Sequence, residues 1–220
     1  MIISLVHQKG GAGKTTLSIG LACELERRGF SVLLIDADLQ QTASTWLEAA
    51  ESEEGLPTVL VAPDGQSLRK KGQLTRVSAG FDYTIIDCPP RLDGVTRSAM
   101  VKSDVVLVPS PPDAADIWAL RETLDVINEA QDFNEELEAY LVINRMHIHS
   151  NSADTGRRAL KEIAEEAEIP ILDTVIHSRV AWPSAMLEGT YVGNYKKGEK
   201  AAKELKRLVN ELLEKLEGVD

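Results

Sequence analysis

Cysteine and aromatic residues are scarce in this chain of 220 residues. There are two cysteines, Cys23 and Cys88, and Phe, Trp and Tyr together make up only 5% of the sequence. Two cysteines so far apart supply neither a disulfide framework nor the paired spacing of a zinc site. This pattern favours a reducing compartment, and a cytoplasmic location is expected.

Long apolar runs are also missing. No run approaches the roughly 20 residues of a membrane-spanning helix, and the first six residues lack the basic lead and cleavage site of a signal peptide. The net charge of −11 argues against a surface coated for nucleic acid but leaves room for a local basic patch. We expect one domain over residues 1–220, without a preceding helix-turn-helix domain.

Short apolar runs alternate with amphipathic stretches along the chain, which is typical of a parallel sheet flanked by helices. The sequence predicts an α/β fold with a doubly wound, mostly parallel sheet and helices on both faces. The expected strands are Ile2–Val6, Val32–Asp36, Thr58–Val61, Tyr83–Asp87, Val105–Val108, Ala139–Ile143 and Ile171–Ile176. Expected helices include Thr15–Arg28, Asp113–Gln131 and Ala153–Glu168.

A glycine-rich segment follows the first expected strand and opens the first expected helix. It reads Gln-Lys-Gly-Gly-Ala-Gly-Lys-Thr-Thr over residues 8–16. Glycines let backbone N–H groups turn inward toward phosphate oxygens, and the helix N-terminus adds its positive dipole end. Lys14 is placed to neutralise the β- and γ-phosphates, and the Thr15 hydroxyl to ligate magnesium. The segment predicts a phosphate-binding loop.

The loop departs from the general pattern in two places. Gln8 stands where that pattern has glycine, and a second lysine, Lys9, lies inside the loop. This form resembles the deviant Walker A box of the ParA/MinD ATPases, and most closely that of small single-domain ParA partition proteins. The resemblance implies that ATP or ADP and Mg²⁺ bind here and that Lys9 reaches the nucleotide of a partner chain. The implied nucleotide contacts in the loop are Lys9, Gly10, Gly11, Ala12, Gly13, Lys14, Thr15 and Thr16.

Aspartates end two further expected strands, where ligand-facing groups of an open α/β sheet belong. The segment containing Asp36 and Asp38 resembles the family's DxDPQ box, with Leu39 in place of proline. By this resemblance Asp38 orients the attacking water. The strand that ends at Asp87 resembles a Walker B strand, which implies that Asp87 holds magnesium through a water.

Two more segments carry expected ligand contacts. Asn144 and Arg145 follow a strand as in relatives that bind adenine there, although a turn that caps the strand is the alternative. Arg179 lies in a stretch that resembles a DNA-contacting region of small ParA proteins, but an intramolecular ion pair is equally compatible. Lys196, Lys200, Lys203 and Arg207 have helical spacing and form a predicted basic stripe, which could bind DNA phosphates or remain solvated.

The resemblance implies an ATPase switch that dimerises with ATP, binds DNA without sequence preference and works with a ParB-like adaptor or activator in partition or positioning. A MinD-like membrane-associated ATPase is the alternative, since such proteins end in a basic amphipathic helix. Glu214 and Glu217 near the C-terminus suit anionic lipid poorly. An iron–sulfur carrier would need paired cysteines, and a catalytically idle scaffold would not need Asp38.

Overall fold

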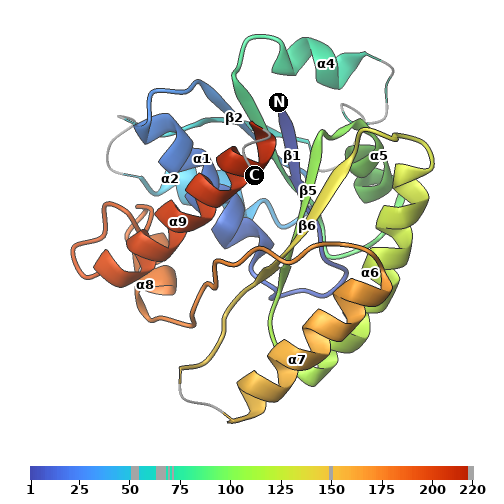
Figure 1. Ribbon diagram of the computed structural model, residues 1–220. Coiled ribbons are helices and arrows are strands. Elements are labelled where there is room, and N and C mark those ends of the chain that lie inside the picture. Colours follow the sequence, from blue (N-terminus) through green and yellow to red (C-terminus); the bar gives the residue numbers. More distant parts are fainter. Residues whose placement is uncertain (51–54, 63–67, 69, 71, 149–150, 218–220) are drawn as a thin grey trace.

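A computed structural model describes residues 1–50, 55–62, 68, 70, 72–148 and 151–217. They form a six-stranded, all-parallel sheet in the order β3-β2-β4-β1-β5-β6 (Figure 1). The strands are β1 (Ile2–Leu5), β2 (Val32–Asp36), β3 (Thr58–Val61), β4 (Tyr83–Asp87), β5 (Val105–Ser110) and β6 (Glu138–Ile143). The predicted fold class is confirmed, and the first six expected strands are present with ends shifted by at most two residues.

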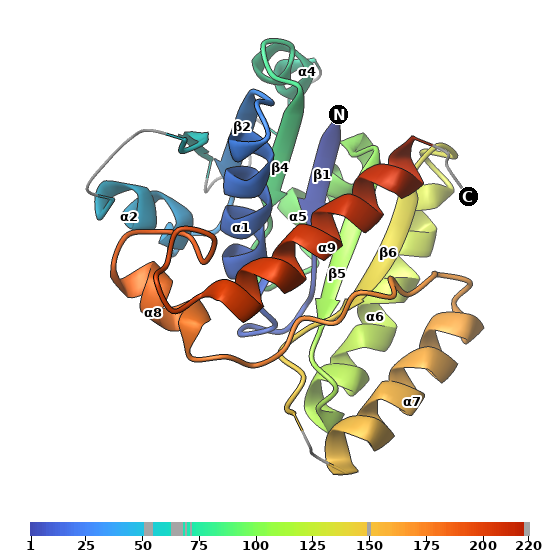
Figure 2. The same cartoon turned by 60° about the vertical axis from the view of Figure 1, so that its left-hand side comes forward.

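The helices cover both faces of this sheet. They are α1 (Lys14–Arg27), α2 (Thr42–Glu48), α4 (Gln73–Ser78), α5 (Gly94–Lys102), α6 (Ala114–Gln131), α7 (Asn151–Glu166), α8 (Ala181–Leu187) and α9 (Glu199–Leu216). Helices α1 and α9 lie on one face, and α5 and α6 lie on the other (Figure 2). None of the described helices is long and apolar enough to cross a bilayer.

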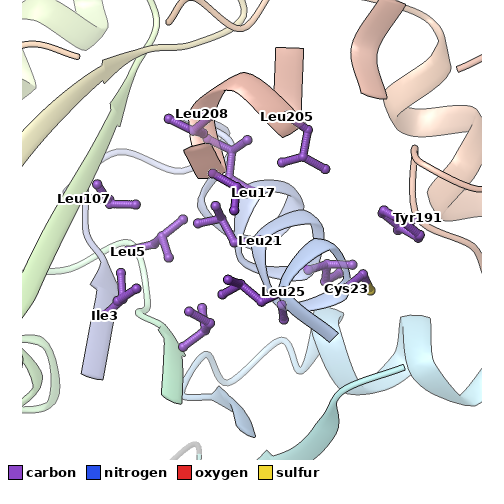
Figure 3. Packing of buried hydrophobic residues seen from close by; sticks show 14 of the residues in the cluster. Ile3, Leu5, Leu17, Leu21, Cys23, Leu25, Leu107, Tyr191, Leu205 and Leu208 are labelled. Atoms are coloured by element: carbon purple, nitrogen blue, oxygen red, sulfur yellow. The ribbon is translucent and has the colours of Figure 1, made fainter. Parts of the chain in front are cut away.

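The strands are buried on both faces, so consecutive side chains enter two separate cores. In β4, Ile85 belongs to the core under α1, whereas Ile86 belongs to the core under α5 and α6. Figure 3 shows how α1 is enclosed in the first core, with strand residues on one side and Leu205 and Leu208 of α9 on another. At Gly20 of α1 a Cβ would come within 3.2 Å of the Leu205 side chain, so glycine allows this close helix packing.

The predicted seventh strand at Ile171–Ile176 is wrong. The segment touches the sheet edge through isolated parallel bridges, from Ile171 to Leu141 and from His177 to Met146. Between them the N–H groups of Leu172 and Ile176 still donate to β6 carbonyls, but those of Asp173 and Thr174 donate to the Glu211 carboxylate of α9 at 2.5 and 2.9 Å. A side chain thus takes the hydrogen bonds that a ladder would use.

Candidate nucleotide-binding site

The sheet topology gathers three distant parts of the sequence. Strand β1 lies beside β4, with Leu5 in register with Asp87, and β4 lies beside β2, with Asp87 in register with Asp36. Because parallel strands end at the same edge, the loop after β1 and both aspartates meet there. The residues predicted from separate motifs therefore share one site.

An open cavity of about 680 Å³ lies at this edge. That volume falls within the range of about 300–1,000 Å³ for small-molecule sites. The connection from α7 to α8 crosses the carboxyl end of the sheet and supplies much of the remaining wall (Figure 2). The residues predicted from sequence that line the cavity are Gly10, Gly11, Gly13, Lys14, Thr15, Thr16, Asp38, Asn144, Arg145 and Arg179.

The phosphate-binding loop is braced by the residues that follow β6. Gly13 has φ of 96°, and a Cβ there would lie 2.2 Å from Asn144 Nδ2. Asn144 Nδ2 donates to the carbonyl of Ala12 at 2.7 Å, and Arg145 Nη1 donates to the carbonyl of Gly11. Both side chains thus fix the backbone of the loop. Their contact with adenine stays a prediction.

The two lysines of the loop point in different directions. Lys14 is buried, and its Nζ donates to the carbonyls of His7 and Lys9 at 3.0 and 3.4 Å, inside the loop. Burial lowers the pKa of Lys14, although the negative Asp87 opposes this. The side chain of Lys9 is 40% exposed, and its Nζ lies 2.6 Å from Asp116 Oδ2 on α6.

His7 is a support of the loop that sequence reasoning missed. Its Nδ1 accepts a hydrogen bond from the backbone N–H of Lys9 at 3.0 Å. Burial, followed by repulsion from Lys14, lowers the pKa of His7 to about 4, so the ring stays a neutral acceptor. The position of His7 directly between β1 and the loop is the signal that could have identified it.

Asp87 has the properties of a metal-site carboxylate. It is fully buried, and its Oδ1 accepts from the Ser18 hydroxyl at 3.2 Å. Its Oδ2 has no hydrogen-bond partner among the described residues. Burial raises the pKa of Asp87 to about 7, although a hydrogen bond from the Thr15 side chain opposes the shift. A buried carboxylate oxygen without a partner, next to a threonine hydroxyl, fits the oxygen ligands that Mg²⁺ prefers.

Asp38 is oriented by its own turn. Its backbone N–H donates to Asp36 Oδ1 at 3.2 Å, and its Oδ1 accepts from the N–H of Gln40 at 3.0 Å. Asp36 is buried, and its other oxygen accepts from the N–H of Ser44 at 3.0 Å. These bonds shape the turn although Leu39 replaces proline, and the half-buried Asp38 side chain remains at the cavity.

Three of the five predicted DNA contacts, Arg179, Lys196 and Lys200, line one groove. Arg179 makes the intramolecular ion pair left open above, with its Nη2 2.5 Å from Glu204 Oε1. Helix α9 begins at Glu199, so the prediction that Lys196 shares its helical face is wrong. Lys203 pairs with Glu199 at 2.7 Å. Lys196 and Lys200 instead line a groove with Lys197, beside residues 178–181, and we call it the lysine groove.

A parallel α/β sheet with a glycine-rich loop between β1 and α1, a buried lysine in the loop and an aspartate on the neighbouring strand defines a phosphate-loop nucleotide-binding protein. Residues 3–192 match the sequence model of the CobQ/CobB/MinD/ParA nucleotide-binding domain. The chain belongs to this family, which includes the ParA- and MinD-type ATPases, as the loop sequence suggested.

Individual relatives agree with this assignment. Maintenance of carboxysome distribution protein A of Halothiobacillus neapolitanus is 31% identical over 213 residues, covering 96% of this chain and 95% of that protein. Chromosome partitioning protein ParA of Caulobacter vibrioides is 28% identical, covering 81% of each. The structure of the septum site-determining protein MinD of Pyrococcus horikoshii with Mg-ADP has the same fold, with a TM-score of 0.76, 22% identity and coverage of 99% and 97%. The expected nucleotide and magnesium agree with the ligand of that relative.

Proposed function

We propose that this protein is an ATP-dependent dimerising switch ATPase that partitions or positions DNA or another large cargo. The two lysines of the phosphate-binding loop carry the proposal. Lys14 is held within its own loop, whereas Lys9 is half-exposed and bonded to Asp116 on a different element. A lysine in that position is available to the nucleotide of a second copy of the chain.

Hydrolysis of ATP to ADP and phosphate needs a positioned water and compensation of the phosphate charge. The Lys14 ammonium and the N–H groups of the loop bind the phosphates, and Asp38 orients the water beside the γ-phosphate. Thr15 and Asp87 would hold Mg²⁺, which supplies further charge compensation when it is bound. Asp87 would act through its buried carboxylate, which the Thr15 side chain approaches.

The dimer forms when Lys9 exchanges Asp116 for the partner's phosphates. In its present ion pair Lys9 is half-exposed but the Asp116 carboxylate is buried, so the contact with the partner's phosphates must offset the cost of leaving that carboxylate unpaired. Loss of the γ-phosphate removes the contact and releases the dimer. An adaptor of the ParB kind is the expected activator, and it would accelerate slow basal turnover.

DNA is proposed to bind at the lysine groove in the ATP dimer. Lys196, Lys197 and Lys200 form no salt bridge of 4.0 Å or less with any described residue, and although Glu199 also lines the groove it is paired with Lys203, so the three lysines outnumber the acidic charge there. Two copies in a dimer raise the apparent affinity through multivalency. The protein would therefore be cytoplasmic and nucleoid-associated when ATP is bound.

The test is the mass in solution with ADP and with ATP, using Asp38→Ala to prevent hydrolysis. A monomer with ADP, a dimer with ATP and a monomer for Asp38→Ala/Lys9→Ala with ATP are expected. An unchanged mass with both nucleotides would refute the switch. Phosphate release by the wild type, lost in Asp38→Ala, tests the ATPase separately.

The membrane alternative has less support. The apolar face of α9 is buried in the core under α1, through Leu205, Leu208, Val209 and Leu212. A bilayer would have to compete with this packing, since insertion needs an exposed apolar face. ATP-dependent flotation with anionic liposomes would favour the alternative. The cysteines give no support to a cluster carrier, because Cys23 and Cys88 are buried in the two different cores.

A further inference from the structure

Two glutamates on α9, two turns apart, hold the segment that precedes α8. Glu211 accepts from the backbone at Asp173 and Thr174, away from the cavity. Glu204 is only 8% exposed and accepts from the backbone N–H of His177 at 3.1 Å and from Arg179 Nε at 3.1 Å. His177 Nδ1 lies 2.9 Å from its Oε1. One buried carboxylate thus anchors two positions of this segment, His177 and Arg179.

The anchored segment is a wall of the nucleotide cavity. Residues 176–180 line it, and Trp182 continues the same wall. The end of β6 and the residues after it hold this wall as far as Ser178: the N–H of Ile176 donates to the Ile143 carbonyl and that of Ser178 to the Met146 carbonyl, both at 2.9 Å. Among the described residues no backbone bond to this edge follows Ser178, so the side chains of His177 and Arg179 depend on Glu204 for their position.

The same wall has a second side. Ser178, Arg179 and Val180 line both the nucleotide cavity and the lysine groove, which has a volume of about 510 Å³. Lys200 of this groove precedes Glu204 by one helical turn on α9. A ligand in either cavity contacts the one segment that Glu204 fixes, so a shift of this segment is felt on both sides.

The Glu204 carboxylate is kept in its ionised form, which accepts these hydrogen bonds. Burial by itself would raise the pKa of Glu204, but the hydrogen bonds from Arg179 and His177 outweigh it and hold the pKa below the ordinary value. Helix α9 lies beyond the residues 3–192 that match the family model, so the anchor comes from a part of the chain outside the matched region.

We propose that Glu204 is a positioning residue that couples nucleotide binding in the cavity to helix α9 and the lysine groove. The inference rests on the proposed nucleotide function. A bound nucleotide and α9 stabilise the same conformation of residues 177–179, so each favours the other. Coupling of this kind is reciprocal. The free energy by which the packing of α9 strengthens nucleotide binding equals the free energy by which bound nucleotide stabilises α9.

The test is amide hydrogen exchange of the full chain with and without ADP, together with ADP affinity by calorimetry. In the wild type ADP should slow exchange in residues 176–180 and in α9 by at least about fivefold. Glu204→Gln should weaken ADP binding by about tenfold and abolish the protection of α9. Glu211→Gln, which removes the matching anchor outside the cavity, should retain both.

The outcomes separate the two levels of the argument. If the wild type binds ADP but α9 exchanges at the same rate with and without ADP, the coupling is refuted and the nucleotide function stands. This comparison uses the wild type alone, so it does not depend on whether a variant folds. Equal ADP affinity and equal protection in Glu204→Gln would refute Glu204 as the coupling residue. Absence of ADP binding by the wild type would refute the nucleotide function and the coupling with it.

Discussion

Replacing Asp87 by asparagine is expected to stabilise the nucleotide-free protein at about pH 8 while removing its response to magnesium. Asp87 is fully buried, its Oδ2 has no partner among the described residues, and its pKa is raised to about 7. An aspartate in an unfolded chain has a pKa of about 3.9. The carboxylate therefore costs folding free energy whenever it is ionised.

The size of this cost follows from the shift of the pKa. About three pKa units at 1.36 kcal/mol each give about 4 kcal/mol as an upper value. Asparagine removes the charge but leaves an amide N–H₂ in place of Oδ2, and an unpaired buried donor costs about 1–3 kcal/mol. A net stabilisation of about 1–3 kcal/mol is expected, which corresponds to roughly 2–4 °C in Tm per kcal/mol for a chain of this length.

The pH dependence gives the sharper assay. Because the carboxyl pKa is raised in the folded state, the folded protein binds the proton more tightly than the unfolded chain between about pH 4 and pH 7. Wild-type stability should fall as the pH rises through this window, and Asp87→Asn should lack that part of the fall. Urea unfolding of both proteins without nucleotide, at about pH 5 and about pH 8, measures the difference. Parallel pH profiles, or a variant less stable at about pH 8, would refute the reasoning.

Further predictions concern the proposed dimer, the loop and the groove. Asp116→Asn frees Lys9 from its ion pair and should tighten the ATP dimer in light scattering by about fivefold or more, because in the wild type the departure of Lys9 leaves a buried carboxylate unpaired; a weaker dimer would contradict this. Trp118 is 75% exposed on the same helix, whereas the other two tryptophans are buried. If Trp118 faces the partner in the ATP dimer, ATP should reduce iodide quenching of its fluorescence, and Trp118→Ala should weaken the dimer. Phe133 is similarly exposed beyond the other end of α6, so Phe133→Ala should leave the dimer unchanged. Gly13→Ala should lose nucleotide binding in calorimetry because its Cβ would collide with a buried amide at 2.2 Å. Alanine at the three lysines of the lysine groove should weaken binding of mixed-sequence DNA and flatten its salt dependence, and an unchanged slope would place the DNA elsewhere.

Much of the core architecture was predictable because its signals are local. Strands buried on both faces are continuous apolar runs, and β2, β3 and β4 were predicted with the observed bounds. The error at Ile171–Ile176 has a physical cause. An apolar run predicts burial, but whether its backbone pairs with a strand depends on competing partners. Here Glu211 of α9 takes the N–H groups of Asp173 and Thr174, so only Leu172 and Ile176 donate to β6.

The residues of the candidate site also divide into those that the sequence predicts and those that only the fold identifies. The phosphate-binding loop could be predicted because its chemistry lies in consecutive residues, with Lys14 and Thr15 beside the glycines that shape the backbone. Asp116 and Glu204 could not be assigned, because each acts through a contact that the fold creates, whereas His7 acts through a local contact with Lys9 and was missed. Lys9 and Asp116 are 107 positions apart, and Arg179 and Glu204 are 25 apart. The bond from Asn144 to the loop was not predicted either, and its contact with adenine stays a prediction.

The sequence by itself determined the phosphate loop, the family and the parallel sheet, since these depend on short-range geometry and on the periodicity of apolar residues. Only the tertiary structure decided where the charged side chains are directed. It turned Lys9 toward α6, left Asp87 Oδ2 without a hydrogen-bond partner among the described residues, and paired Arg179 with Glu204. The physical reason is that an ionic or hydrogen-bonding group takes whichever partner the packing brings within about 3 Å, and that partner is set by the whole fold.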